Sequence, residues 1–313
     1  NLPATLPILT SPLNLPAPPD GHPYYLGLED RKYWNTNPAS NHDTAPEAQR
    51  YYVRKGAQSN TKPNPNPREI CPSFVEQMFG TESPAAGQEP NMWGFVQNYA
   101  GLKGNNDVAG IMECYTPDQV PVLSRLAKNY GVCDRWFGSV PCETWPNRAF
   151  LHAGTSFGRL NNCDQKYTEE CIPNFFVYAG KRTIFDVLDE QSIRWGLYQD
   201  ALVPGTLVSS QFWTVGQKLT RTAKQLWDLA SDLRQPWAPK YIFIEPSYGV
   251  DPNDQHPPHK VASGETLIQN VYKILTASGV WHKTLLLILY DEHGGCFDHV
   301  PPPAAVPPDS SAK

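Results

Sequence analysis

The chain has 313 residues, a formal net charge of -5 and 40% hydrophobic residues, including 9 Trp, 15 Tyr and 12 Phe. This apolar content can form a substantial core, which excludes wholesale disorder. No run rich in lysine or arginine is present, which argues against nucleic-acid binding, and the longest apolar stretch, residues 285–290, is far shorter than the ~20 residues that cross a bilayer.

The N-terminal part of the chain is rich in proline, of which the sequence holds 32 residues. Residues 1–65 show little periodicity, so we expect an irregular segment rich in Pro, Asn and Tyr, followed by a globular domain over residues 66–313. The chain begins without Met and shows no leader-like pattern. We therefore expect a processed protein or a fragment.

The first regular elements are predicted from residue 116 onward. Residues 116–131 have Thr116 at the N-cap position and Pro117 at the first helical position, followed by an apolar face, which predicts a helix. Residues 132–140 are predicted as a strand and residues 144–154 as a second helix.

Helices and strands then alternate along the second half of the chain. Helices are predicted over 183–191, 223–233 and 264–279, and strands over 194–200, 240–245 and 283–292. The strands are near-continuous apolar runs, which is typical of parallel strands buried on both faces. The sequence therefore predicts an α/β fold with a mostly parallel sheet, helices on both faces and long Pro-rich loops.

Acidic side chains stand at the carboxyl ends of the predicted strands: Asp200, Glu245, and Asp291 with Glu292. Ligands of open parallel sheets bind beyond this edge, so we expect the site there. Adjacent carboxylates followed by His293 can offer ligands to a divalent cation or polarise a phosphoryl oxygen, and the next two residues are glycines that allow a tight turn. The alternative is a strand-to-loop turn with solvated acids.

A second candidate group lies in the stretch SVPCETWPNRAF, where Thr144 precedes a predicted helix start. A hydroxyl there is either a helix cap or a nucleophile whose oxyanion is stabilised by the free N–H groups of the helix. Asn147 and Arg148 add amide and guanidinium donors, and arginine suits either phosphate contact or a structural ion pair. His152 is predicted to be a packed core residue.

Two further histidines, His256 and His259, flank two prolines in a polar loop. Their spacing matches no zinc motif, so the pair alone carries little information.

Taken in order, the motifs T-W-P-N-R, I-F-I-E-P, N-D-Q-H-P-P-H and D-E-H-G-G-C-F-D-H-V-P-P-P resemble the phosphoesterase family of phosphatidylcholine-type phospholipases C and related acid phosphatases. The match runs from about residue 65 to 305. The resemblance implies an alkaline-phosphatase-like α/β fold and a phosphoesterase catalytic domain over residues 66–313 that is incomplete at both ends. It also implies attack on phosphorus by a hydroxyl group, with a covalent phospho-enzyme intermediate that water hydrolyses.

The resemblance gives roles to residues at matching positions. Thr144 matches the nucleophile, Asp291 and Glu292 match the metal-binding acids, and His256 matches a histidine that would protonate the leaving alkoxide. Contacts to the phosphate or to these groups are expected from the remaining candidates: Asn147, Arg148, His293 and Glu245. The expected cofactor is a divalent metal ion, with Ca²⁺, Mg²⁺, Zn²⁺ and iron all open.

The chain also departs from the family pattern. The E-N-R-S-F-D-H segment, whose Glu and Asn complete the family's metal site, has no counterpart in this sequence, and neither does the histidine that usually precedes Q-x-F-G. This chain reads N-P-R-E-I-C-P-S-F-V-E-Q-M-F-G at that place and stops before the family's G-x-R-V-P strand. We interpret it as the middle of a longer protein.

The expected function is that of a phospholipase C-type hydrolase, which releases diacylglycerol and a phosphorylated head group. An acid phosphatase acting on monoesters and an inactive family member that binds lipid or protein are the alternatives. Expected partners are a phospholipid or small phosphoester and a membrane surface, but no nucleic acid. A secreted or periplasmic location is inferred from the family and from a candidate disulfide between Cys163 and Cys171, although isolated cytosolic thiols fit the cysteine count equally.

Overall fold

The structure is a computed structural model that describes residues 31–162, 178, 180–200, 223–248, 250–308 and 310. The candidate disulfide between Cys163 and Cys171 lies outside the described residues. The division of the chain at residue 65 stays a prediction. No helix in the described part of the chain combines the length and hydropathy needed to cross a membrane.

A three-stranded parallel sheet with the strand order β6-β5-β7 stands at the centre of the second half of the chain. Its strands are β5 (Trp195–Gln199), β6 (Ala223–Gln225) and β7 (Tyr241–Glu245). The central strand β5 pairs in parallel with both neighbours, with Gln199 opposite Gln225 on one side and Glu245 on the other. The carboxyl ends of all three strands therefore meet at one edge, where Glu245 is fully buried.

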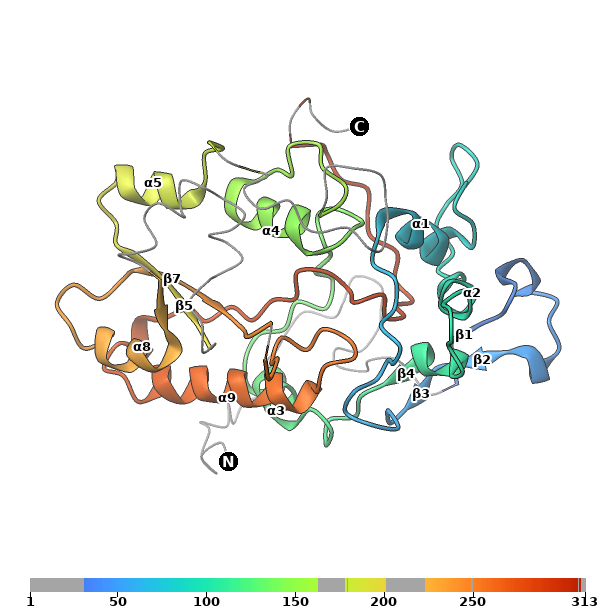
Figure 1. Cartoon of the computed structure of the whole chain (residues 1–313), viewed down its shortest axis with the longest axis horizontal. Coiled ribbons are helices and arrows are strands. Elements are labelled where there is room, and N and C mark those ends of the chain that lie inside the picture. The colour runs from blue at the N-terminus through green and yellow to red at the C-terminus, as the bar shows by residue number, and fades with distance from the viewer. Residues whose placement is uncertain are drawn as a thin grey trace, which may run out of the picture.

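Helices cover both faces of this sheet (Figure 1). They are α4 (Thr144–Ala153) and α5 (Ile184–Glu190) on one face, and α8 (Leu226–Asp232) and α9 (Val261–Thr276) on the other. Leu197 and Phe243 point toward α4 and α5, whereas Tyr198 and Ile244 pack with α8 and α9. Burial on both faces explains the continuous apolar runs, and it confirms the predicted α/β class for this sheet.

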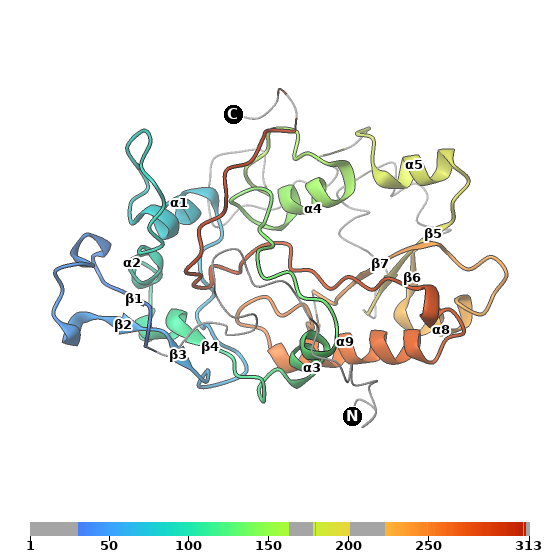
Figure 2. The ribbon, with the colours of Figure 1, turned by 180° about the vertical axis from the view of Figure 1, so that it is seen from behind.

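The other part of the described chain contains short elements around a second core (Figure 2). Its helices are α1 (Cys71–Phe79), α2 (Phe95–Ala100), η1 (Ala39–Asn41), η2 (Glu47–Gln49) and η3 (Val108–Met112), and its strands are β1 (Trp34–Asn35), β2 (Tyr51–Tyr52), β3 (Arg54–Lys55) and β4 (Glu113–Cys114). The pair β1-β2 is antiparallel and the pair β3-β4 is parallel. Phe297 packs edge-on against Phe95 at 5.2 Å between ring centroids, which anchors the C-terminal segment to this core.

Helix α3 (Pro121–Asn129) packs on α9, and a 3-10 turn η4 (Trp281–Lys283) follows α9. Helix α3 starts later than the predicted Thr116, because residues 116–120 form a turn in which Gln119 and Val120 N–H groups donate to the Thr116 carbonyl. Residues 223–225, predicted as the start of a helix, form strand β6 instead.

Two predicted strands are wrong. Residues 132–140 are irregular, with Trp136 59% exposed, because this stretch pairs with no strand among the described residues. Residues 283–292 form no strand either, and Leu285 is 81% and Leu287 64% exposed. Only Leu286 of this run packs against the core beside α9. The run is therefore covered on one side, whereas its composition predicted a strand buried on both faces.

Candidate functional site

Thr144, the predicted nucleophile, is the first residue of α4 and is half-buried. It does not cap the helix, because Glu143 occupies the N-cap position with an extended backbone. The turn before it is fixed by the side chain of Asn147, which donates to the carbonyls of Val140 (3.1 Å), Cys142 (2.9 Å) and Glu143 (3.3 Å). The Asn147 carbonyl oxygen also accepts from the Val140 N–H at 2.9 Å. Asn147 therefore holds the approach to Thr144.

Arg148 lies one turn along α4 and joins two of the predicted acids. Its Nη1 donates to Glu245 Oε1 at 2.6 Å and its Nε to Asp291 Oδ2 at 2.9 Å. The Glu245 side chain is 1% exposed and the Arg148 side chain 11%. The guanidinium, predicted as a phosphate contact or an ion-pair partner, is in this structure an ion-pair partner that ties α4 to the end of β7 and to the loop at Asp291.

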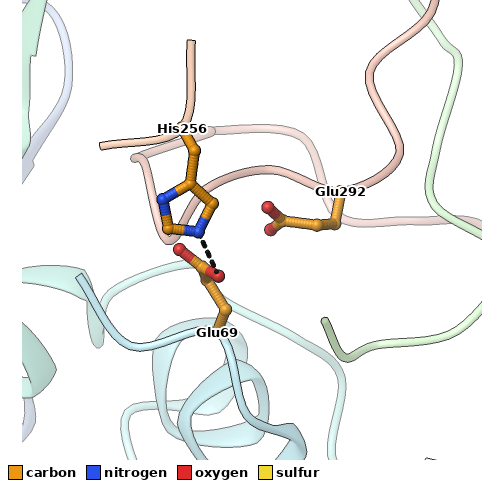
Figure 3. A group of neighbouring side chains, drawn as sticks. All are labelled: Glu69, His256 and Glu292. Carbon is orange, nitrogen blue, oxygen red and sulfur yellow. Dashed lines mark hydrogen bonds and ion pairs between the residues drawn. The ribbon is translucent and has the colours of Figure 1, made fainter. Parts of the chain in front are cut away.

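Glu292 belongs to a different group, in which it meets His256 and Glu69 (Figure 3). One ligand atom from each of these three side chains lies within 4.8 Å of the other two. His256 Nε2 is 3.1 Å from Glu69 Oε2, and His256 Nδ1 is 2.8 Å from the Pro257 carbonyl oxygen, to which it can only donate. Glu69 and Glu292 are largely buried, with 10% and 6% of their side chains exposed.

The electrostatics of this group reflect acids held close together away from water. Burial raises the pKa of Glu292 to about 7, and the nearby charge of Glu69 adds to the rise. Burial also raises the pKa of Glu143 to about 7, again with a contribution from Glu69, so the start of α4 lies within reach of the same charges. The hydrogen bond to Glu69 raises the pKa of His256 to about 9 against the opposing effect of burial.

The two glycines after His293 bring these side chains together. Gly294 and Gly295 have φ angles of 63° and 65°, in the left-handed region that glycine adopts at no steric cost. A Cβ on Gly295 would lie 2.4 Å from Pro67 Cβ, and one on Gly294 would lie 3.4 Å from Pro257 Cδ. The turn thus fits between the segments that carry Glu69 and His256.

His293 lies behind Glu292 and fixes the same turn. Its Nε2 is 2.8 Å from Gln77 Oε1, its Nδ1 accepts from the Gly295 N–H at 3.0 Å, and its ring stacks on Phe74 with 4.0 Å between centroids. Gln77 in turn donates to the Arg68 carbonyl at 2.9 Å, next to Glu69. These bonds give His293 a positioning role in the structure.

The predicted candidates therefore fall into two groups. Arg148, Glu245 and Asp291 form an ion-paired group beside the Asn147 turn, and Glu292 and His256 meet at the second group. The groups adjoin, because Asp291 of the first and Glu292 of the second are consecutive residues. Asp291 also lies beside the Asn147 turn, since a Cβ added to Gly138 would be 3.3 Å from Asn147 Oδ1 and 3.6 Å from the Asp291 carbonyl oxygen.

The prediction missed Glu69. It lies in the segment N-P-R-E-I-C, which differs from the family pattern by the absence of a histidine. In the structure, Glu69 Oε1 is buried and has no hydrogen-bond partner. A buried carboxylate oxygen of this kind, beside a second carboxylate and an imidazole, fits the ligand chemistry of a divalent metal ion.

The model of the phosphoesterase family matches residues 31–313. The chain belongs to this family. Non-specific phospholipase C5 of Arabidopsis thaliana is 36% identical over 249 residues, which cover 77% of this chain and 46% of that relative. Non-specific phospholipase C4 of the same plant is 34% identical over 278 residues, or 86% of this chain and 49% of the relative.

A bacterial member, phospholipase C B of Mycobacterium tuberculosis, is 30% identical over 234 residues, or 67% of this chain and 42% of the relative. The family resemblance seen in the sequence motifs is therefore confirmed. The chain spans about half the length of the curated relatives it matches.

Proposed function

We propose that this chain carries the central part of a phospholipase C-type phosphoester hydrolase with an alkaline-phosphatase-like fold. Its substrate would be a phospholipid, cleaved to diacylglycerol and a phosphorylated head group. The observation that supports this most is the hydroxyl of Thr144 at the N-terminus of a ten-residue helix, next to a turn fixed by Asn147. Relatives named as phospholipases C add to this support.

In this proposal the Thr144 oxygen attacks phosphorus, the bond from phosphorus to the diacylglycerol oxygen breaks, and the proton lost by the Thr144 hydroxyl is balanced by the proton that the departing diacylglycerol oxygen gains. The Trp145 N–H already donates to Asn162 Oδ1 at 2.8 Å, so the group that would stabilise the negative charge developing on the phosphoryl oxygens is the positive end of the α4 dipole. Water then attacks the phosphothreonine, releases the phosphorylated head group and restores the hydroxyl. Asn147 keeps the nucleophile in place by holding the preceding turn.

A divalent cation at such a site supplies positive charge to a non-bridging phosphoryl oxygen, and the resemblance implies Asp291 and Glu292 as its ligands. Arg148 and Glu245 hold the Asp291 side chain in a fixed position. The resemblance also implies His256 as the donor of a proton to the leaving alkoxide. Both of its ring nitrogens already have partners, so this role requires the contact with Glu69 to open.

The location follows from the same proposal. A hydrolase of phospholipids would work at a membrane surface. We therefore propose a secreted or periplasmic location with peripheral membrane contact. Nothing in the acidic composition favours nucleic acid as a competing partner.

The test is to introduce Thr144→Ala and Thr144→Ser into the full-length protein that contains these residues and to compare both with the unchanged protein on a chromogenic phosphocholine diester and on p-nitrophenyl phosphate. We expect Thr144→Ala to lower kcat by at least about 1,000-fold, as loss of a nucleophile does, and Thr144→Ser to keep part of the activity. Thr266→Ala, on the exposed face of α9, is the matched control. Unchanged turnover in Thr144→Ala would remove the nucleophile assignment, and a monoester rate far above the diester rate would replace the phospholipase proposal with a phosphatase.

A further inference from the structure

The group formed by Glu69, His256 and Glu292 differs from an ordinary cluster of surface acids, because its acids are buried and one carboxylate oxygen has no hydrogen-bond partner. Glu69 is nine-tenths buried and its Oε1 has no hydrogen-bond partner. A buried carboxylate oxygen without a partner costs free energy, so native structures retain one mainly where a ligand completes it. Figure 3 shows this carboxylate pointing at the His256 imidazole, with the Glu292 carboxylate directed at the same space from the side.

The charges around this space call for a cation. Among the described residues, the ion-pair partner of Glu69 is His256, at 3.1 Å. His293 Nδ1 lies 3.5 Å from Glu292 but accepts the Gly295 N–H, so it brings no positive charge to that carboxylate. Arg148 is already held by Glu245 and Asp291. The two carboxylates therefore share one imidazole, that of His256, and the side chain of Asp291 faces the other group.

We propose that Glu69, His256 and Glu292 together bind one divalent metal ion of the class that accepts imidazole nitrogen, such as Zn²⁺ or Mn²⁺, in preference to Ca²⁺ or Mg²⁺. Ca²⁺ and Mg²⁺ prefer all-oxygen surroundings, whereas Zn²⁺ binds mixed sets of histidine and carboxylate. Three protein ligands would leave a coordination position open, as in catalytic zinc sites. Glu69, which the motifs did not identify, becomes a ligand.

The orientation of each side chain suits this role. His256 donates its Nδ1 hydrogen to the Pro257 carbonyl, which makes Nε2 the nitrogen available to a metal. The Gly294 N–H donates to Glu292 Oε2 at 2.6 Å and orients that carboxylate. Zinc bonds of ~2.0–2.2 Å place ligand atoms ~3–4 Å apart, so small side-chain rotations from the present separation, within 4.8 Å, would close the site.

This inference rests on the proposed function only for the use of the metal in hydrolysis. It replaces two assignments that the resemblance implies. Asp291, whose carboxylate is bound by Arg148, is not a ligand of this ion, and His256 bound to metal through Nε2 has no proton there to give. The charge of Glu69 contributes to the raised pKa of Glu143, the residue that precedes Thr144 at the start of α4.

The experiment measures metal binding directly. The full chain is stripped with a chelator and titrated by calorimetry with Zn²⁺, Mn²⁺, Mg²⁺ and Ca²⁺ in turn. We expect one equivalent of Zn²⁺ to bind most tightly, and Glu69→Gln and His256→Gln each to weaken it by at least about 100-fold. Glu82→Gln and His282→Gln, an exposed acid and an exposed histidine away from the group, are the matched controls and should bind as the unchanged chain does.

Two further measurements keep the result free of folding artefacts. Circular dichroism in chelator checks that each variant is folded. If Glu69→Gln fails to fold, Glu69→Asp, which keeps a shorter carboxylate, takes its place, and we expect it to bind Zn²⁺ about 10-fold less tightly than the unchanged chain. With Mn²⁺ bound, electron spin-echo spectroscopy should show coupling to a histidine nitrogen that His256→Gln loses.

Zinc binding that is unchanged in Glu69→Gln and His256→Gln would overturn the inference, as would tighter binding of Mg²⁺ or Ca²⁺ than of Zn²⁺. A full-length protein that binds Zn²⁺ through these residues but hydrolyses no phosphoester would overturn the proposed function and leave the metal site standing.

Discussion

Two pairs of carboxylates lie side by side in this molecule, and they differ in what stands between them. Glu245 and Asp291 share the Arg148 guanidinium, with contacts of 2.6 and 2.9 Å. Glu69 and Glu292 meet at the His256 imidazole, where the contact to Glu69 is 3.1 Å and Glu69 Oε1 has no hydrogen-bond partner. The first pair has its cation built into the chain and stabilises the fold. The second pair has room for a cation from solution.

Removing the built-in cation should have the largest effect on stability. Arg148→Met would leave the buried Glu245 charge uncompensated, and breaking a buried ion pair in this way costs ~3–5 kcal/mol. Urea denaturation should show this loss for Arg148→Met and almost none for Arg125→Met, an exposed arginine of α3. A loss below ~1 kcal/mol would mean that the Arg148 group contributes little to the fold.

The second group depends on a turn, so its next most sensitive point is a glycine. Gly295→Ala would place a Cβ 2.4 Å from Pro67 Cβ on a residue with φ of +65°. Strain of this kind costs ~1–3 kcal/mol before the clash is added, and the shift of Pro67 would carry Glu69 away from Glu292. Gly279→Ala, whose Cβ would meet nothing within 4 Å, is the control. Equal stability and zinc binding in the two variants would refute the account of the turn.

Histidines offer a further contrast, because His152 lies on the same helix as Arg148 and packs against Phe185 and Phe243. Burial, and then the charge of Arg148, lower the pKa of His152 to about 3. In the unfolded chain His152 binds a proton near pH 6.5, so acid favours unfolding. The stability that the neutral His152 contributes is complete above that pH and is lost as the pH falls toward 3.

From these pKa values we expect ~2 kcal/mol of stability to be lost from this residue between pH 7 and pH 5. Urea denaturation across this range should show a smaller loss in His152→Phe than in the unchanged chain, while His282→Gln, an exposed histidine, should follow the unchanged chain. The same acid sensitivity in His152→Phe would contradict the assignment.

Two of the three strands of the sheet, β5 and β7, were predicted because their signal is local, whereas β6 was predicted as the start of a helix. The apolar runs at β5 and β7 and the amphipathic pattern of α9 each lie within one short stretch. As the runs indicate, β5 is buried on both faces, and β7 is packed on both faces although it is half-buried. The expectation that a continuous apolar run forms a buried strand failed at residues 283–292, because the run alone does not determine which other elements pack against it. Leu285 is 81% exposed although its composition matches that of a buried strand.

The site was predicted in part for a similar reason. The motifs gave Thr144, His256 and Glu292, but the pairing of Arg148 with Glu245 and Asp291 joins residues 97 and 143 positions apart in the sequence. Glu69 is 187 positions from His256. Only the folded chain shows that this acid stands beside them, because no local pattern distinguishes it from a solvated surface residue.

The measurement that tests the central claim most directly is zinc anomalous diffraction from crystals of the full chain soaked in Zn²⁺, recorded on both sides of the zinc absorption edge. The account predicts one strong anomalous peak bounded by Glu69, His256 and Glu292, with Asp291 still bound to Arg148. A peak that excludes Glu69 and His256, or no peak within this group in a chain that binds zinc elsewhere, would contradict it.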